Sequence, residues 1–153
     1  MEMKLMQLKF YNVPEKIKLD QLKLAANFYA EQLMHKNLVK NLEIRVCFTK
    51  NGGNTTMWED NNLRPREFTI TLDHGMGYRY TFLTLAHEMV HVKQYATGEL
   101  RDYVSGGPDM LRWRDEKRDW GNIEYWDLPW EQDAYGKERG LYAKFRSFLK
   151  KSA

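Results

Sequence analysis

The chain has 153 residues, of which 42% are hydrophobic and 14% aromatic, so it can bury a sizeable core, and we expect one domain over residues 1–153. The formal net charge of +3 is too small to indicate a nucleic-acid-binding protein by itself. The single cysteine, Cys47, excludes an intramolecular disulfide and a zinc site of several cysteines, and it fits a reducing compartment. Because no apolar run has the length of a signal peptide or a membrane span, we expect a cytoplasmic protein without a membrane partner.

The N-terminal half of the sequence predicts strands and one helix. Four short segments show alternating apolar and polar residues or frequent β-branched residues, which is typical of half-buried strands. These segments are residues 3–13, 42–48, 55–58 and 68–72. Between the first two, apolar residues recur at helical spacing from Asp20, the expected N-cap, to about His35. Cys47 is expected to be a small core residue, and Asp73 and His74 are expected to form a turn.

The C-terminal half predicts two longer helices. The first covers about residues 80–97, with one apolar face and Gly98 as a stop signal. The second covers about residues 129–149 and begins with Pro129, which suits a first helical position. The segment between them, residues 99–128, has no clear period, and we expect a loop. Three tryptophans are expected to hold this loop in place: Trp113, Trp120 and Trp126.

The first of these helices contains the sequence HEMVH at residues 87–91. On an α-helix, His87 and His91 lie about 40° apart in projection and about 6 Å apart along the axis, so both imidazoles can bind one metal ion. Glu88 is rotated by about 100° from His87 and can reach a metal-bound water without being a ligand. Zinc suits such a site, because it lowers the pKa of bound water to about 7 and polarises a carbonyl.

A catalytic zinc ion usually has three protein ligands, so the two histidines need a partner. No histidine follows His91, and the glycine and histidine of the longer metzincin motif are replaced by Gln94 and Thr97. The two other histidines, His35 and His74, lie upstream. A downstream carboxylate is therefore the best candidate for the third ligand.

The last predicted helix offers such a carboxylate in Glu131. Glu131 is in phase with Ala134 and the apolar stripe that follows it, whereas Asp133 is in phase with Lys137 and is expected to face solvent. A buried carboxylate is costly unless a cation neutralises it, which favours Glu131 as a ligand. The alternative is a capping role for Glu131 at the third helical position. Glu138, two turns further along, is either a partner of the site or part of a surface ion pair.

The combination of HEMVH with a glutamate on a later helix resembles the gluzincin group of zincin metallopeptidases. The segments HEMVHVKQYATGEL and YWDLPWEQDAYGKE are similar to small metallopeptidase-like proteins of bacteriophages and bacteria, over roughly residues 66–142. The resemblance implies an α+β fold with a minimal zincin core, in which a small mixed sheet packs on the N-terminal helix, the HExxH helix and a C-terminal ligand helix. It also implies that His87, His91 and Glu131 bind Zn²⁺ and that Glu88 is the general base in hydrolysis of a peptide or protein substrate.

Two intracellular zincin groups fit less well. SprT-like proteases take a later histidine as third ligand, which this chain lacks. Repressor-cleaving zincins have an asparagine where this chain has Tyr135. Neither substrate class is therefore carried over to this protein.

The hypothesised reaction needs a hydrogen-bond donor for the oxyanion and a place for the substrate. Tyr135, one turn after Glu131, and Tyr95, one turn after His91, are the candidate donors. The strand at residues 68–72 could accept an extended peptide if it lies at the edge of the sheet.

Two other functions remain open from the sequence. The same three ligands could support a zinc hydrolase that acts on a non-peptide amide. A non-catalytic module could bind nucleic acid through the basic C-terminal helix, although a solvated helix face explains the charges equally well.

Overall fold

The structure is a computed structural model that describes residues 5–57, 65–102 and 110–152. The fold is mixed α+β, as the sequence predicts. The start of the first predicted strand at Met3 and the end of the third at Trp58 lie outside the described residues, as do residues 103–109 of the predicted loop. No helix among the described residues is long and apolar enough to cross a membrane.

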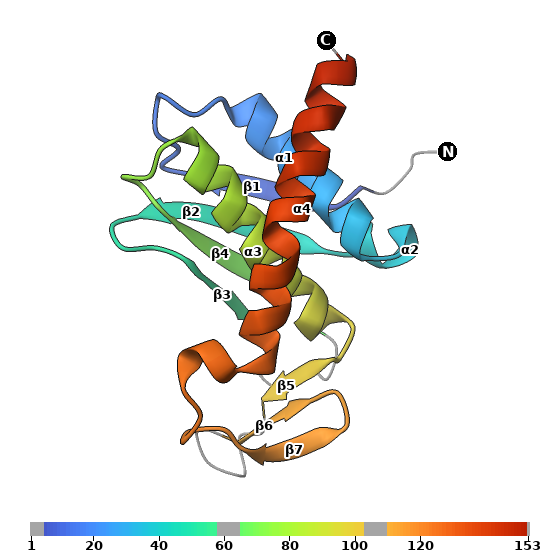
Figure 1. Ribbon diagram of the computed structural model, residues 1–153. Helices are drawn as coiled ribbons and strands as arrows, with labels where there is room; N and C mark the ends of the chain where they lie inside the picture. The colour runs from blue at the N-terminus through green and yellow to red at the C-terminus, as the bar shows by residue number, and fades with distance from the viewer. Residues whose placement is uncertain (1–4, 58–64, 103–109, 153) are drawn as a thin grey trace.

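A four-stranded sheet forms one layer of the fold (Figure 1). Its strands are β1 (Gln7–Tyr11), β2 (Glu43–Thr49), β3 (Asn54–Met57) and β4 (Glu67–Asp73), in the order β1-β2-β4-β3. The first three in this order are parallel, and β3 pairs antiparallel with β4. β4 has a neighbour on both sides, so residues 68–72 do not lie at the edge of the sheet and do not meet the condition for accepting an extended peptide. Among the residues that the structure describes, the edge strand on this side of the sheet is β3.

The central strands of the sheet show the alternating burial that their sequences predict. In β2 and β4 every second residue is fully or almost fully buried on the face toward the helices, namely Ile44, Val46, Phe48, Phe68, Ile70 and Leu72. Cys47 lies between two of these positions and is only half-buried. The pleat of the strand places Cys47 on the opposite face of the sheet, so the expectation that it is a core residue is wrong.

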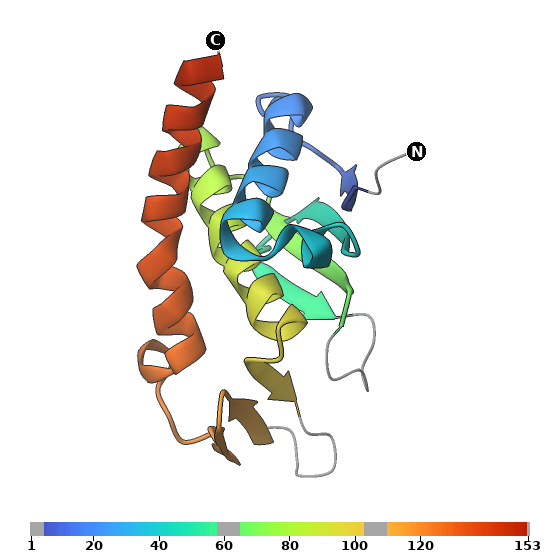
Figure 2. The same ribbon diagram turned by 90° about the vertical axis from the view of Figure 1, so that its right-hand side faces the viewer.

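The helices are α1 (Leu19–Leu33), α2 (Lys36–Val39), α3 (Tyr78–Ala96) and α4 (Pro129–Ser152). In Figure 2, α1 and α3 lie between the sheet and α4, and α4 crosses the outer side of α3. Several helix boundaries differ slightly from the prediction. α1 begins one residue before Asp20 with Lys18 as N-cap and ends at Leu33 rather than near His35. α3 begins at Tyr78, and α4 extends to Ser152. The sequence analysis did not predict the short helix α2.

Because α3 packs against the sheet, α1 and α4, 13 of its 19 residues are buried. Its buried residues include the polar side chains His87, Glu88, His91 and Gln94. The core on the other side of α3 contains Phe82 stacked on Phe145 of α4, with ring centroids 5.8 Å apart. Burial of this many polar groups requires partners for each of them.

Residues 99–128 do not form the predicted loop. They contain a three-stranded antiparallel sheet of β5 (Leu100–Asp102), β6 (Met110–Trp113) and β7 (Glu116–Asp119), followed by the 3₁₀ helix η2 (Tyr125–Asp127). This sheet lies at the end of the molecule where α4 begins (Figure 1). It has a small core of Leu100, Trp113, Trp120 and Trp130.

Two of the three predicted tryptophan anchors are confirmed. Trp113 and Trp120 contact the ring of Trp130, at centroid distances of 6.3 and 5.2 Å. Trp126 is 66% exposed, so its expected anchoring role is wrong, and Trp130 on α4 is the anchor instead. The small sheet is thereby attached to the first turn of α4.

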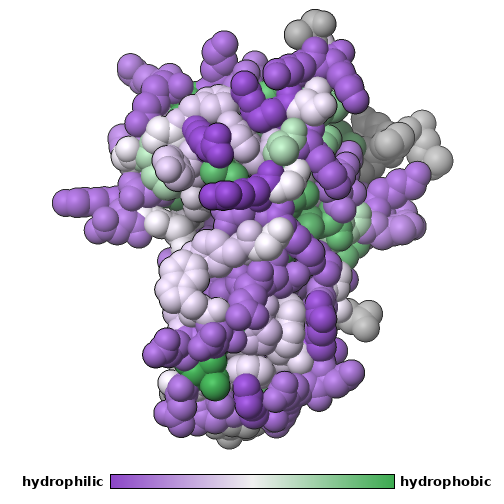
Figure 3. Space-filling view, viewed as in Figure 1, coloured by the Kyte–Doolittle hydropathy of each residue, from purple (hydrophilic) through white to green (hydrophobic). Residues whose placement is uncertain are grey.

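Figure 3 shows the face of the molecule that α4 crosses. Hydrophilic residues cover most of it, and the hydrophobic residues visible there form only small groups. The exposed residues of α4 include Arg139, Lys144, Arg146, Lys150 and Lys151, as expected for a solvated helix face.

Candidate metal centre

The two histidines of HEMVH lie one turn apart on the same face of α3. His87 is 7% and His91 8% exposed, and their ring centroids are 4.9 Å apart. This arrangement confirms the prediction that both imidazoles face the same way. The carboxylate that lies beside both imidazoles comes from α4.

The third residue of the group is Glu131, in the first turn of α4. Its Oε1 atom lies 3.0 Å from Nε2 of His87 and 3.2 Å from Nε2 of His91. One ligand atom from each of the three side chains falls within 4.8 Å of the others, so the group could hold a metal ion. Because the Glu131 carboxylate contacts both imidazoles, its side chain is engaged with the centre rather than with the helix end.

The hydrogen bonds at the other ring nitrogens define the tautomers of the histidines. Nδ1 of His87 lies 3.3 Å from Oε1 of Glu138, and Nδ1 of His91 lies 2.7 Å from Oε1 of Gln94. Both oxygens are acceptors, so each Nδ1 carries a hydrogen. In the neutral imidazoles both Nε2 lone pairs then face Glu131, as a metal site requires.

Glu138 is therefore a partner of His87 rather than part of a surface ion pair with a lysine or arginine. Its carboxylate adds a second negative charge beside the imidazole pair. A histidine that donates its Nδ1 hydrogen to a carboxylate is held in one orientation and binds a metal more strongly through Nε2. The sequence left open whether Glu138 is a partner of the site or part of a surface ion pair, and the structure supports a partner of the site.

The ionisation of the group shows that it attracts positive charge. Burial lowers the pKa of His87, but hydrogen bonds to Glu131 and Glu138 outweigh burial and raise the pKa to about 9. The pKa of His91 is also raised, because hydrogen bonding and charge attraction from Glu131 overcome burial. Burial raises the pKa of Glu131, but the two histidines lower it to about 2. Protons on the imidazoles or a metal cation can supply the charge that balances Glu131.

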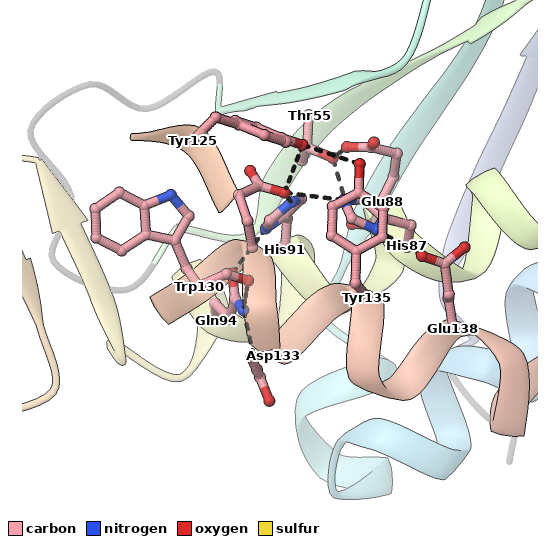
Figure 4. Close-up of polar contacts among 11 residues, drawn as sticks. Thr55, His87, Glu88, His91, Gln94, Tyr125, Trp130, Asp133, Tyr135 and Glu138 are labelled. Carbon is pink, nitrogen blue, oxygen red and sulfur yellow. Dashed lines mark hydrogen bonds and ion pairs between the residues drawn. The ribbon is translucent and has the colours of Figure 1, made fainter. Parts of the chain in front are cut away.

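Glu88 points to a different side of α3 from the two histidines. It is only 3% exposed, and its Oε1 accepts a 2.6 Å hydrogen bond from Oγ1 of Thr55 on β3 (Figure 4). Burial raises the pKa of the Glu88 carboxyl, while the Thr55 hydrogen bond opposes that rise. A carboxylate in this position can take up a proton more readily than one in water.

A cavity of about 410 Å³ connects these groups. Its walls include Thr55 of β3, His87, Glu88 and His91 of α3, and Glu131 of α4. The candidate base and the candidate ligands thus open onto the same space.

Three tyrosines that line this cavity are candidate donors. The hydroxyl of Tyr125 donates to Oε1 of Glu131 at 3.1 Å and lies 3.2 Å from the hydroxyl of Tyr135. Tyr135 packs its ring against His87, with centroids 4.4 Å apart. Burial, Tyr135 and Glu131 together raise the pKa of Tyr125, so its hydroxyl stays protonated. Tyr95 also lines the cavity that contains His91.

Sequence reasoning missed Tyr125 because it belongs to η2, a single 3₁₀ turn without a periodic pattern. It also missed Thr55 and Gln94, whose roles depend on contacts between elements far apart in sequence. The only local signal for Tyr125 was its position six residues before Glu131.

Asp133 contradicts the expectation that it faces solvent. Its side chain is 13% exposed, its Oδ2 accepts from Nε2 of Gln94 at 2.9 Å, and it forms an ion pair with Lys137. The first turn of α4 packs against α3 over a wider arc than the apolar stripe predicts, so Asp133 contacts the buried amide of Gln94.

The remaining predicted residues have structural roles. Asp73 accepts a hydrogen bond from the backbone of Gly75, and the backbone of His74 donates to Thr49, which confirms the expected turn. His35 caps the N-terminus of α2 through a hydrogen bond from Asn37. None of these residues lines the cavity of the candidate centre.

Comparison with known proteins adds no identification: no protein-family model matches the chain, and neither curated proteins nor solved structures give a match.

Proposed function

We propose that this protein is a zinc metallopeptidase with a minimal zincin-like core and a gluzincin-type ligand set. The observation that carries the proposal is the convergence of two imidazole Nε2 atoms and one carboxylate beside a buried glutamate and a cavity. The order of elements, with a small mixed sheet followed by the HExxH helix and the helix of Glu131, supports the zincin-like core.

The donor set suits zinc. His87, His91 and Glu131 offer two nitrogens and one oxygen, which zinc accepts, whereas magnesium and calcium prefer oxygen ligands alone. When bound, zinc would supply a Lewis acid and would lower the pKa of a water molecule in the cavity.

Glu88 is the proposed general base. It removes a proton from the water whose oxygen forms a bond to the peptide carbonyl carbon, and it then delivers that proton to the nitrogen of the leaving amine as the C–N bond breaks. Thr55 occupies Oε1 of Glu88, which leaves Oε2 for the proton. Tyr125 and Tyr135 are the proposed donors to the oxyanion, with Tyr125 the nearer to Glu131.

The substrate is proposed to be an extended peptide. Such a peptide can add, through backbone hydrogen bonds, to the side of β3 that pairs with no strand of the described residues. Gly53, Asn54 and Thr55 line the cavity, so a peptide on this strand would pass the candidate centre.

The proposal is tested by comparing the wild-type protein with Glu88→Gln. Elemental analysis should find one zinc per chain in both proteins. Cleavage of a peptide library should fall at least about 100-fold in the variant, because general-base catalysis contributes roughly 10²–10⁴-fold. Unchanged cleavage by the variant would exclude Glu88 from the mechanism.

Zinc content and peptide cleavage of the wild-type protein, together with assays of small-amide hydrolysis and DNA binding, distinguish the other two functions. A zinc-loaded protein that hydrolyses small amides but no peptide in the library would be an amide hydrolase. A protein without stoichiometric metal that binds DNA in a salt-dependent manner would be a binding module. Either result would overturn the peptidase proposal.

A further inference from the structure

Gln94 is the one fully buried amide side chain on α3 among the described residues, with 0% of its surface exposed. It lies three residues after His91 and does not belong to the ligands or the base of the proposed reaction. An amide buried in this way is costly unless its donors and acceptor all find partners. The partners of Gln94 explain why the residue is tolerated there.

Each polar atom of the Gln94 amide is hydrogen-bonded (Figure 4). Oε1 accepts from Nδ1 of His91 at 2.7 Å. Nε2 donates to the backbone carbonyl of Trp130 and to Oδ2 of Asp133, both at 2.9 Å. These three bonds also define which end of the amide is oxygen, because neither a carbonyl nor a carboxylate can donate.

The two acceptors on α4 lie on either side of Glu131 in sequence. The carbonyl of Trp130 is part of the peptide bond between Trp130 and Glu131, and Asp133 is in the same helical turn as Glu131. Gln94 therefore attaches the turn that carries Glu131 to the turn of α3 that carries His91. One side chain orients one imidazole and fixes the backbone of the carboxylate ligand at the same time.

We propose that Gln94 is a positioning residue that assembles the metal site across the α3–α4 interface. This inference rests on the proposed metal site and does not depend on whether the substrate is a peptide. It requires an amide at position 94. A glutamate could accept from His91, but it would have no hydrogen for the carbonyl of Trp130 and would lie against the carboxylate of Asp133.

Asp133 keeps its negative charge in this network because Lys137, one turn along α4, lies 2.6 Å from Oδ1. The carboxylate therefore accepts from Gln94 on one oxygen and from Lys137 on the other. The chain of contacts from His91 through Gln94 and Asp133 ends at a lysine on the surface of α4.

The test compares zinc affinity in the full-length wild-type protein, Gln94→Glu and Gln94→Met, measured by competition with a chromophoric chelator. Both variants should bind zinc about 10–100-fold more weakly, which is the usual effect of removing a hydrogen-bond partner of a metal ligand. Gln32→Glu, an exposed position on α1, is the control for the change in charge and should bind zinc as the wild type does.

A double variant separates positioning from simple packing. When Gln94→Glu is combined with Asp133→Asn, the new amide on α4 can donate to the new carboxylate on α3. The bond between the two positions is thereby restored with donor and acceptor exchanged. Zinc affinity should recover by at least about threefold over Gln94→Glu alone, and the visible spectrum of the Co²⁺-loaded protein should shift back toward that of the wild type. A role in packing alone predicts neither recovery.

Zinc affinities of Gln94→Glu and Gln94→Met within about twofold of wild type would overturn the inference while leaving the proposed peptidase function intact. The reverse case is also distinguishable: weakened zinc binding in both variants, with no peptide cleavage by the wild type, supports Gln94 and removes the peptidase function. If both single variants fail to fold, Asp133→Ala decides, because it removes one bond at the border of the interface. Its zinc affinity should fall about tenfold, and an unchanged affinity would overturn the inference.

Discussion

The hydroxyl of Thr55 lies 2.6 Å from Oε1 of Glu88 and donates a hydrogen bond to it, although 33 residues separate the two in sequence. Through this contact the edge strand β3 holds a buried carboxylate of α3. The strand proposed to bind substrate is thus physically connected to the proposed general base.

Thr55→Val is expected to lower kcat by about 10–100-fold, since a hydrogen bond to a charged group contributes about 1.5–3 kcal/mol. Zinc content should remain unchanged, because Thr55 is hydrogen-bonded to Glu88 rather than to a proposed ligand. Thr55→Ser keeps the hydroxyl and should retain most of the activity. Steady-state kinetics of the three proteins measure this difference, and equal activities of the valine and serine variants would exclude the hydrogen bond from catalysis.

Glu131→Ala is expected to weaken zinc binding much more than Asp133→Ala. The first variant would lose a ligand, whereas Asp133 contacts the site only through Gln94. We expect a loss of at least about 100-fold for the first variant and of about tenfold for the second. Chelator competition gives both affinities, and the opposite order would identify Asp133 as the ligand.

The stability of the metal-free protein should depend on pH through His87. Its pKa is raised from 6.5 to about 9, since the hydrogen bonds to Glu131 and Glu138 overcome burial. A histidine with a raised pKa stabilises the fold fully below pH 6.5, and this contribution disappears as the pH rises through 9. The Tm measured in the presence of a chelator should therefore fall between pH 6.5 and 9.

Glu131 contributes to the pH dependence of stability at low pH rather than at high pH. Its pKa is lowered from 4.5 to about 2 by the two histidines, so its contribution is present above pH 4.5 and is lost as the pH falls toward 2.

The variant His87→Asn tests the contribution of His87 at high pH. In this variant the decrease in Tm above pH 6.5 should be smaller than in the wild type. Zinc binds neutral imidazole, so its affinity should rise over the same interval in which the metal-free protein loses stability.

Tyr125→Phe is expected to lower kcat more than Tyr135→Phe. The hydroxyl of Tyr125 contacts Glu131 directly, whereas that of Tyr135 reaches the carboxylate only through Tyr125. Removal of one oxyanion donor costs roughly 10²–10³ in kcat. Because Tyr125 is also a hydrogen-bond partner of the proposed ligand Glu131, its loss should weaken zinc binding as well, so kcat is measured at saturating zinc. A larger loss of kcat in Tyr135→Phe would favour the donor that the sequence suggested.

Phe145 and Phe148 lie on the same helix, α4, and differ in burial, so their replacement by alanine tests how much the buried face of α4 stabilises the fold. Phe145 is fully buried and contacts Phe28, Tyr29 and Phe82. Its replacement by alanine should lower the free energy of unfolding by about 3–5 kcal/mol. Phe148 is 38% exposed, and its replacement should cost about 1 kcal/mol or less. Urea denaturation in a chelator measures both, and similar losses would show that α4 packs differently.

The residues that sequence reasoning located belong to helices, where geometry is local. The spacing of His87 and His91 and the phase of Glu131 follow from 3.6 residues per turn, and the structure brings the three together. The same reasoning failed for Asp133, because a single apolar stripe does not describe how wide the contact between two helices is. A long buried glutamine extends that contact beyond the stripe.

The parts that were not predicted depend on non-local pairing. The four residues of β7 are all charged and exposed, so they show no alternation from which a strand could be inferred. The position of β4 inside the sheet depends on β3 folding back beside it, which a single-strand pattern does not contain. Trp126 and Trp130 are equally apolar in the sequence, and only the packing of the small sheet on α4 distinguishes the exposed ring from the buried one.

His91 and Glu131 are 40 residues apart in sequence, and the chain between them leaves the centre, forms the small sheet, and returns. An ion bound by these two side chains would close a loop of this length in the way that a disulfide does. The chain-entropy relation for such a closure gives about 4 kcal/mol. In a sequence whose single cysteine excludes an internal disulfide, the ion would serve as a cross-link that a chelator removes and added metal restores, without any oxidation or reduction.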